Sequence, residues 1–183
     1  MKIKTYSLSL LLAVCALATY DARSQEKAMP CAETPSQEMK GMDMDAMNKR
    51  GDHVMGFDHT RTTHHFLLTK DGGVIQVEAN DGNDSASRDK IRMHLSHIAM
   101  MFAEGDFNAP MLIHKQSPPG VSVMKSEKAK IEYAFEEIEK GGRVTIKTKD
   151  AEALKAVHDF LRFQVHEHQT GDPVEVNKRA LGL

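Results

Sequence analysis

The chain has 183 residues, and its 24 Lys and Arg nearly balance its 26 Asp and Glu, for a net charge of −2. The basic residues are scattered, so the sequence lacks the positive patch that nucleic-acid binding requires. Its length is that of a single domain with a short leader, and this domain is long enough to bury a small core.

The first 18 residues predict an export signal. Lys2 and Lys4 are followed by the apolar run Leu8–Cys15, which is too short to span a bilayer, and then by the small-x-small sequence Ala-Leu-Ala ending at Ala18. Cleavage there would leave Cys31 as the only thiol, so no internal disulfide could form. No later apolar run is long enough for a membrane span. We therefore expect a soluble exported protein, periplasmic or extracellular.

Residues 19–58 are rich in Met and His, and their second half reads MKGMDMDAMNKRGDHVMGFDH. With so few Leu, Ile and Val, this segment is predicted to be flexible rather than a core helix. Thioether sulfur and imidazole nitrogen favour copper, above all Cu(I), over hard cations. The composition therefore indicates metal binding, and the alternative is a disordered tether whose methionines are incidental.

An α+β domain is predicted for residues 59–173, followed by a tail at 174–183. The segments 62–69 (TTHHFLLT) and 74–79 (VIQVEA) have the character of strands. The turn 70–73 (KDGG) between them supplies the positive φ angles of a tight hairpin.

A polar loop at 80–87 then precedes a predicted helix that runs to Ala103 and ends at Gly105. The apolar segment 111–114 (MLIH) predicts a short strand. After the breaker Pro-Pro-Gly, we expect a helical turn within 121–128.

The same arrangement is predicted to occur a second time. Strands are expected at 130–138 and 143–148, and Asp150 is expected to cap a helix that ends near His168. Aligning GGVIQVEAND with GGRVTIKTKD indicates an internal ββα duplication. The predicted fold class is therefore α+β, with two ββα units forming one antiparallel sheet and two helices packed on one face.

Several histidines of this domain are candidate metal ligands. On the first helix His94, His97 and Met101 follow one edge at spacings of three and four, so they could reach one ion. The alternative is that they are semi-buried packing residues. On the first strand His64 shares the covered face with Phe66, so it could approach this helix. We hypothesise that His114 converges there as well.

The second helix is predicted to bury one stripe and to present Phe160 and Phe163 on the opposite side. These two aromatics suggest a contact surface for a second copy, a partner protein or the N-terminal segment. The tripeptide His166-Glu167-His168 lacks the HExxH spacing, so no metalloprotease is indicated.

Two resemblances add to this interpretation. The runs MGFDHTRTTHHF, IRMHLSHIAMMFAEGDFNAPMLIH and HDFLRFQVHEHQTGDP resemble, in this order, a family of exported bacterial proteins. That resemblance covers about residues 55–173 and brings no assigned chemistry. The Met-rich segment is similar in composition to the Met/His tracts of periplasmic copper-resistance proteins, which implies capture of Cu(I) or Ag(I) at Met42, Met44 and Met47.

The leading hypothesis is an exported metal-binding protein, with copper as the expected ion and zinc as the alternative, that serves buffering, transfer or tolerance. A second hypothesis is a small metal-dependent enzyme that uses His94, His97 and a third imidazole from His64 or His114. No nucleophile motif or phosphate loop names a reaction. A third is a non-metal interaction module. Since the Met-rich stretch ends inside the first strand at His64 and His65, it could pass metal to a more ordered histidine site on the first helix.

Overall fold

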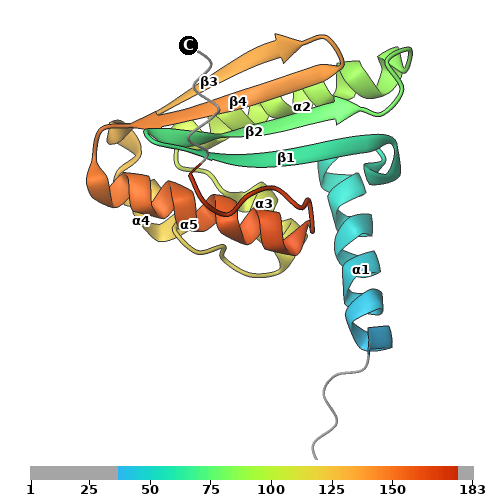
Figure 1. Cartoon of the computed structure of the whole chain (residues 1–183), viewed down its shortest axis with the longest axis horizontal. Helices are drawn as coiled ribbons and strands as arrows, with labels where there is room; N and C mark the ends of the chain where they lie inside the picture. Colours follow the sequence, from blue (N-terminus) through green and yellow to red (C-terminus); the bar gives the residue numbers. More distant parts are fainter. Residues whose placement is uncertain (1–36, 177–183) are drawn as a thin grey trace, which may run out of the picture. The chain divides into compact units, whose positions relative to one another are not determined.

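The computed structural model describes residues 37–176, with side chains from Met44 onward. Its sheet forms from the two predicted hairpins: β1 (Thr62–Thr69) pairs with β2 (Gly72–Ala79), and β3 (Ile131–Ile138) pairs with β4 (Gly141–Thr148). The hairpins join through β2 and β4, so the antiparallel strand order is β1-β2-β4-β3 (Figure 1).

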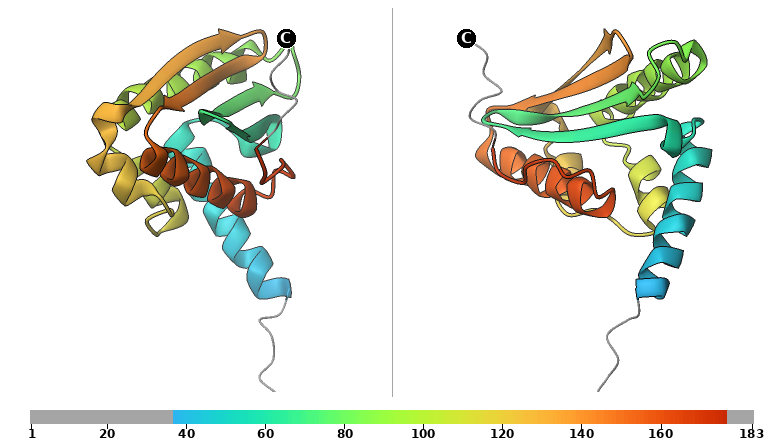
Figure 2. Two further views of the ribbon diagram at one scale, coloured as in Figure 1. Left: turned by 60° about the vertical axis from the view of Figure 1, so that its left-hand side comes forward. Right: turned by 45° about the vertical axis from the view of Figure 1, so that its right-hand side comes forward.

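Two long helices follow the hairpins, and each begins at a capping aspartate. Before α2 (Ser85–Ala103), the side chain of Asp84 accepts a hydrogen bond from the backbone N–H of Ser87. Before α5 (Ala151–Glu167), Asp150 accepts from two backbone N–H groups of the first turn. Both helices cover one face of the sheet (Figures 1 and 2). The predicted fold class, with two ββα units and two helices on one face of an antiparallel sheet, is confirmed.

Each helix packs mainly on the hairpin of the other unit. The side chain of Leu161 in α5 lies against Gly73, where an added Cβ would come within 2.1 Å of Leu161 Cδ1. Leu95 in α2 lies against Gly142 in the same manner, with 3.4 Å to its Cδ1. Because α2 contacts chiefly β3 and β4, and α5 contacts chiefly β1 and β2, neither unit buries its core alone.

The two units correspond residue by residue. Strand pairing places His64 of β1 at the position that Tyr133 has in β3. In the helices, Leu95 and Leu161 stand at the same distance from their N-caps, and both are buried. The helical positions that follow therefore also correspond, although the loop before α5 is the shorter one.

The Met-rich segment is a helix over much of its length, α1 (Gln37–Met55). The prediction of a flexible segment at 19–58 is therefore corrected for residues 37–55. Met47 is 6% exposed and Met55 8%, and both join the core. Methionine is a good helix former with an apolar, adaptable side chain, so here it packs into the core as Leu or Ile would. The predicted export signal and Cys31 lie outside the described residues.

Two short helices cover the remaining sides of the core. The MLIH segment is not a strand but the end of α3 (Asn108–His114), where Pro110 occupies the first turn and needs no hydrogen-bonded N–H. The expected helical turn is present as α4 (Val121–Ser126). Two 3₁₀ turns, η1 (His59–Arg61) and η2 (Lys128–Lys130), lead into β1 and β3.

The outer side of α5 is packed against α4, so α5 is covered on two sides. Phe160 is only 2% exposed, and its ring lies 5.8 Å from that of Phe102 and 6.1 Å from that of Phe107. The predicted partner surface is therefore wrong for Phe160, which is an internal core residue. Phe163 is half-buried beside His114, at 5.0 Å between ring centroids. Within residues 37–176, no helix is both long and apolar enough to cross a membrane.

Candidate metal site

Four imidazoles line a cavity of about 60 Å³ between the sheet and the helices packed on it. They come from four different elements: His64 from β1, His94 from α2, His114 from the end of α3, and His168 from the C-cap of α5. Most of the other lining residues are apolar, among them Phe66, Ile75 and Phe160. We call this space the imidazole cavity.

Three of these rings contact one another in the order His64, His168, His114. His64 and His168 are stacked, with centroids 5.9 Å apart and planes 8° from parallel. The ring of His168 also meets that of His114 edge-on, at 5.1 Å. His94 is linked to the group through Phe57, whose ring lies 5.7 Å from His94 and 6.0 Å from His64.

Several polar atoms of the cavity wall are buried without a hydrogen-bond partner in the described structure. They are Nε2 of His64, Nδ1 of His114 and Nε2 of Gln164. The other ring nitrogen of His114, Nε2, lies 3.1 Å from Oε1 of Gln164, and its Nδ1 lies 3.8 Å from a carboxylate oxygen of Glu167. A buried polar atom with no hydrogen-bond partner costs about 1–3 kcal/mol, so the unpartnered Nε2 of His64 favours a bound ligand.

The burial that isolates these rings also keeps them neutral. Burial lowers the pKa of His64 to about 4, that of His94 to about 4 and that of His168 to about 3. It lowers the pKa of His114 as well. At neutral pH all four are therefore uncharged imidazoles, which is the form that coordinates a metal ion.

A second pocket of about 340 Å³ adjoins this cavity on the side of α1. Its wall contains three methionines, Met44, Met47 and Met55, together with His59, and we call it the thioether pocket. It shares Met55, His64 and His168 with the imidazole cavity. Sulfur and nitrogen donors thus line these two adjoining spaces, which we together call the recess.

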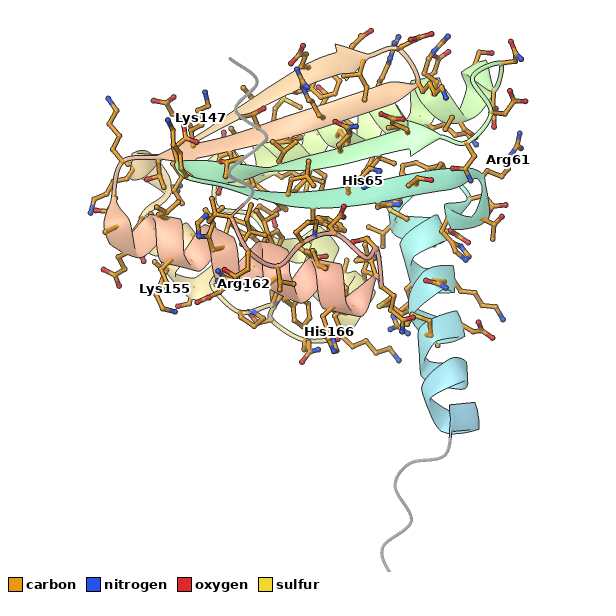
Figure 3. All side chains as sticks on the ribbon, in the orientation of Figure 1. Arg61, His65, Lys147, Lys155, Arg162 and His166 are labelled. Carbon is orange, nitrogen blue, oxygen red and sulfur yellow. The ribbon has the colours of Figure 1, made fainter. Side chains whose placement is uncertain are left out.

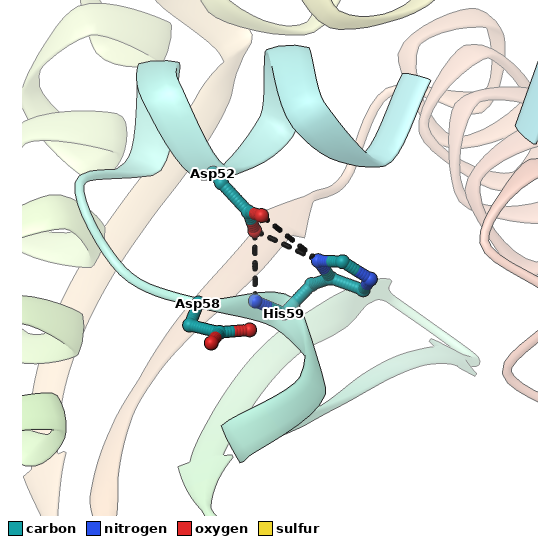
Figure 4. A group of neighbouring side chains, drawn as sticks. All are labelled: Asp52, Asp58 and His59. Atoms are coloured by element: carbon teal, nitrogen blue, oxygen red, sulfur yellow. Dashed lines mark hydrogen bonds and ion pairs between the residues drawn. The ribbon is translucent and has the colours of Figure 1, made fainter. Parts of the chain in front are cut away.

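A group of Asp52, Asp58 and His59 stands at the end of α1 and could hold a metal ion, because its candidate ligand atoms lie within 4.8 Å of one another (Figure 4). Asp52 accepts from the ring nitrogen Nδ1 of His59 at 2.9 Å and from its backbone N–H at 2.8 Å. Asp58 accepts from the side chain and backbone of Thr60, and these hydrogen bonds lower the pKa of Asp58.

The contact between Asp52 and His59 fixes the protonation of the ring. A carboxylate only accepts, so Nδ1 of His59 carries the proton, and Nε2 of the neutral ring is left with a lone pair. A carboxylate that holds one ring nitrogen in this way is the usual second partner of a metal-binding histidine. His59 can therefore act as a ligand in the thioether pocket that it lines.

Comparisons with family models, curated proteins and solved structures give no match for this chain.

The structure brings most of the predicted ligands to this recess. His64, His94 and His114 line the imidazole cavity, and Met44 and Met47 line the thioether pocket. Met42 lies on the same helix, α1. The other two predicted ligands do not join them. His97 is exposed on α2, and Met101 packs partly buried against the core without lining either space.

Sequence reasoning did not identify His168 as a ligand, although the internal duplication holds a signal. At the corresponding positions of the other unit, His64 is replaced by Tyr133, His168 by Phe102 and His94 by Phe160. Phe102 lies 5.9 Å from Tyr133 and 5.8 Å from Phe160, so these rings form an equivalent corner. Since the fold fills this equivalent corner with Phe and Tyr rings, the imidazoles of the first corner are not required for packing.

Proposed function

We propose that the protein is an exported metal-binding protein that holds copper where the thioether pocket meets the imidazole cavity. The observation that carries this proposal is the position of His64 and His168, which line both spaces as neutral imidazoles. His64 adds a buried Nε2 that has no hydrogen-bond partner in the described structure. Export is supported by the N-terminal sequence pattern alone.

Copper is the ion that this donor set favours. Thioethers and imidazoles suit Cu(I), whereas hard cations prefer carboxylate oxygens, and no Asp or Glu of the described chain lines either space. Thioethers do not titrate, and burial lowers the pKa of both His64 and His94 to about 4, so binding would persist in mild acid. Asp52 would support His59 as a further ligand from the side of α1.

The arrangement also supports transfer of the ion. Met44 is half-buried, Met47 and Met55 are buried, and the imidazole cavity lies beyond them. An ion captured at the outer thioethers would pass to His64 and His168, which belong to both spaces. Because burial increases from Met44 to Met47 and Met55, this arrangement suits a protein that buffers or carries copper.

A double substitution, His64→Phe with His168→Phe, tests this proposal. The corresponding positions, Tyr133 in the second unit and Phe102 in the first, already hold aromatic side chains in contact, so the variant should fold while it loses two ligands. In a Cu(I) titration of the mature protein against a competing chelator, we expect its affinity to fall by about 100-fold or more. The matched control is His166→Gln, because His166 lies outside on α5 (Figure 3) and should leave affinity unchanged. Equal affinity of a folded double variant and the wild type would overturn the proposal.

One observation favours a second candidate, a metal-dependent enzyme. The imidazole cavity offers four neutral histidines, whereas a catalytic zinc site needs three and keeps one open position. Its volume of about 60 Å³ leaves room for a water molecule next to an ion. Metal analysis of natively expressed protein separates the candidates: one tightly held zinc or iron indicates the enzyme, and exchangeable copper indicates the carrier.

A further inference from the structure

The outward face of α2 carries an uncommon combination of side chains. Met93 is 59% exposed and Met100 is 55% exposed, and these two methionines are among the few large apolar residues of the described chain that face solvent. His97, which is also exposed, stands between them. We call these three residues the α2 stripe.

Helix geometry places the three side chains in one line. His97 follows Met93 by four residues and precedes Met100 by three, and such neighbours have Cβ atoms about 5–6 Å apart. At about 100° per residue, the three positions fall within an arc of about 60°. A thioether, an imidazole and a second thioether can therefore reach one ion above the helix surface.

The α2 stripe differs from the ligand set that the sequence predicts for this helix, which is His94, His97 and Met101. His94 lines the imidazole cavity, whereas the ring of His97 is exposed to solvent. Met101 packs against the core, unlike Met100. The exposed imidazole of His97 is therefore combined with Met93 and Met100, and not with His94 and Met101.

Packing does not explain these residues. Met93 and Met100 are more than half exposed, and His97 is exposed as well, so none of the three belongs to the core. At the corresponding positions of α5 the chain has Asp159, Phe163 and His166. The fold thus accepts unrelated side chains there, and the soft-donor set is particular to α2.

We propose that Met93, His97 and Met100 form a second, surface site for Cu(I) or Ag(I), separate from the imidazole cavity. Two thioethers and one imidazole are soft and borderline donors that select these ions over Mg²⁺ or Ca²⁺. Because all three side chains are exposed, the ion can enter and leave without any movement of the fold. The site therefore exchanges metal with external donors or acceptors, and it does not depend on the function proposed above.

Ag(I) titration of the mature protein, labelled with ¹³C at the methionine methyls, tests the site. We expect the signals of Met93 and Met100, assigned from single Leu variants, to shift together as one equivalent binds. The variant M93L/M100L should bind one equivalent less, since Leu keeps the helix propensity but lacks the sulfur. The matched control is Met101→Leu, which should keep full stoichiometry.

The same titration in the H64F/H168F background separates this proposal from the function proposed above. In this variant the methyl signals of Met93 and Met100 should still shift, whether or not the wild type binds metal at the recess. Unmoved Met93 and Met100 signals in the wild type would overturn the surface site. Loss of their shifts in the H64F/H168F background would also overturn it as an independent site.

Discussion

The imidazole of His64 stacks on that of His168 at 5.9 Å, and the rings at the two corresponding positions, Tyr133 and Phe102, are also 5.9 Å apart. The angle differs, because the imidazoles are nearly parallel at 8° whereas the carbon rings meet edge-on at 75°. The duplicated fold thus brings a strand residue and a helix-end residue together twice. Of these two contacts, only the one between His64 and His168 presents nitrogen lone pairs to a cavity.

The metal-free protein should lose stability as the pH falls. The ordinary histidine pKa of 6.5 applies to the unfolded chain, whereas burial lowers the pKa of folded His64 to about 4 and that of His168 to about 3. Between these values the unfolded chain binds more protons, so stability is complete above about pH 6.5 and declines toward about pH 4. We expect a loss on the order of a few kcal/mol, measured as urea midpoints in the presence of a chelator. The H64F/H168F variant should show a shallower decline, and an equal slope would contradict the burial of these rings.

Replacing Met44 and Met47 by Leu should weaken binding of soft ions alone. Leu and Met have similar volumes, so the loss of stability from the buried Met47 should stay below about 1.5 kcal/mol. Without two thioethers we expect Cu(I) affinity to fall by about 10-fold or more, while Zn(II) binding through imidazoles is unchanged. Competition titrations with both ions measure this difference. An equal fall for both ions would mean that the change acts through packing rather than through sulfur.

Asp52→Asn should affect metal binding more strongly than Asp58→Asn. The amide can no longer hold the proton on Nδ1 of His59 as a carboxylate does, and such outer partners typically contribute 10- to 100-fold in metal affinity. Asp58 caps η1 through Thr60 and serves as the matched control. Equal losses in both variants would instead indicate that Asp52, Asp58 and His59 bind the ion together as one group.

His158 shows that a buried histidine of this protein can be purely structural. Its Nε2 lies 2.9 Å from the carbonyl oxygen of Thr69 and 3.0 Å from that of Gly72, so it donates to the turn of the first hairpin. His158→Leu should leave both carbonyl groups without this donor and cost about 1–3 kcal/mol of unfolding free energy. Cu(I) affinity of the folded variant should not change, and a large fall would place His158 in the metal site.

Most of the fold was predictable because its strands, turns and long helices follow local patterns. Strand-like segments on both sides of Gly-Gly turns predicted the hairpins, and the aspartates before the helices predicted their starts. The prediction of a strand at 111–114 is wrong, because so short a segment does not distinguish the two-residue period of a strand from the 3.6-residue period of a helix. The α1 helix was missed because its apolar face consists of methionines such as Met47.

The site was only partly predictable. The position of His64 on the covered face follows from strand alternation, and the sequence supported its approach to the first helix. His168 stands at the C-cap of α5, and its approach to His64 depends on the crossing of α5 over the first hairpin. His97 does not line the cavity with His94, because the two positions differ by about 60° around α2 and His97 falls on the solvent side.

The crossed packing of Leu161 on Gly73, and of Leu95 on Gly142, links the two units before the imidazole cavity can form. Helix α2 has no hairpin to cover until β3 and β4 have formed, and β1 stays partly uncovered until α5 has packed on it. Formation of the fold therefore depends on contacts between residues far apart in the sequence. His168 stands at the C-cap of α5, so the imidazole cavity closes only when this helix end has reached β1. If the proposed ion binds there, loading would be a late event, and the ion would link the last helix end to the first strand.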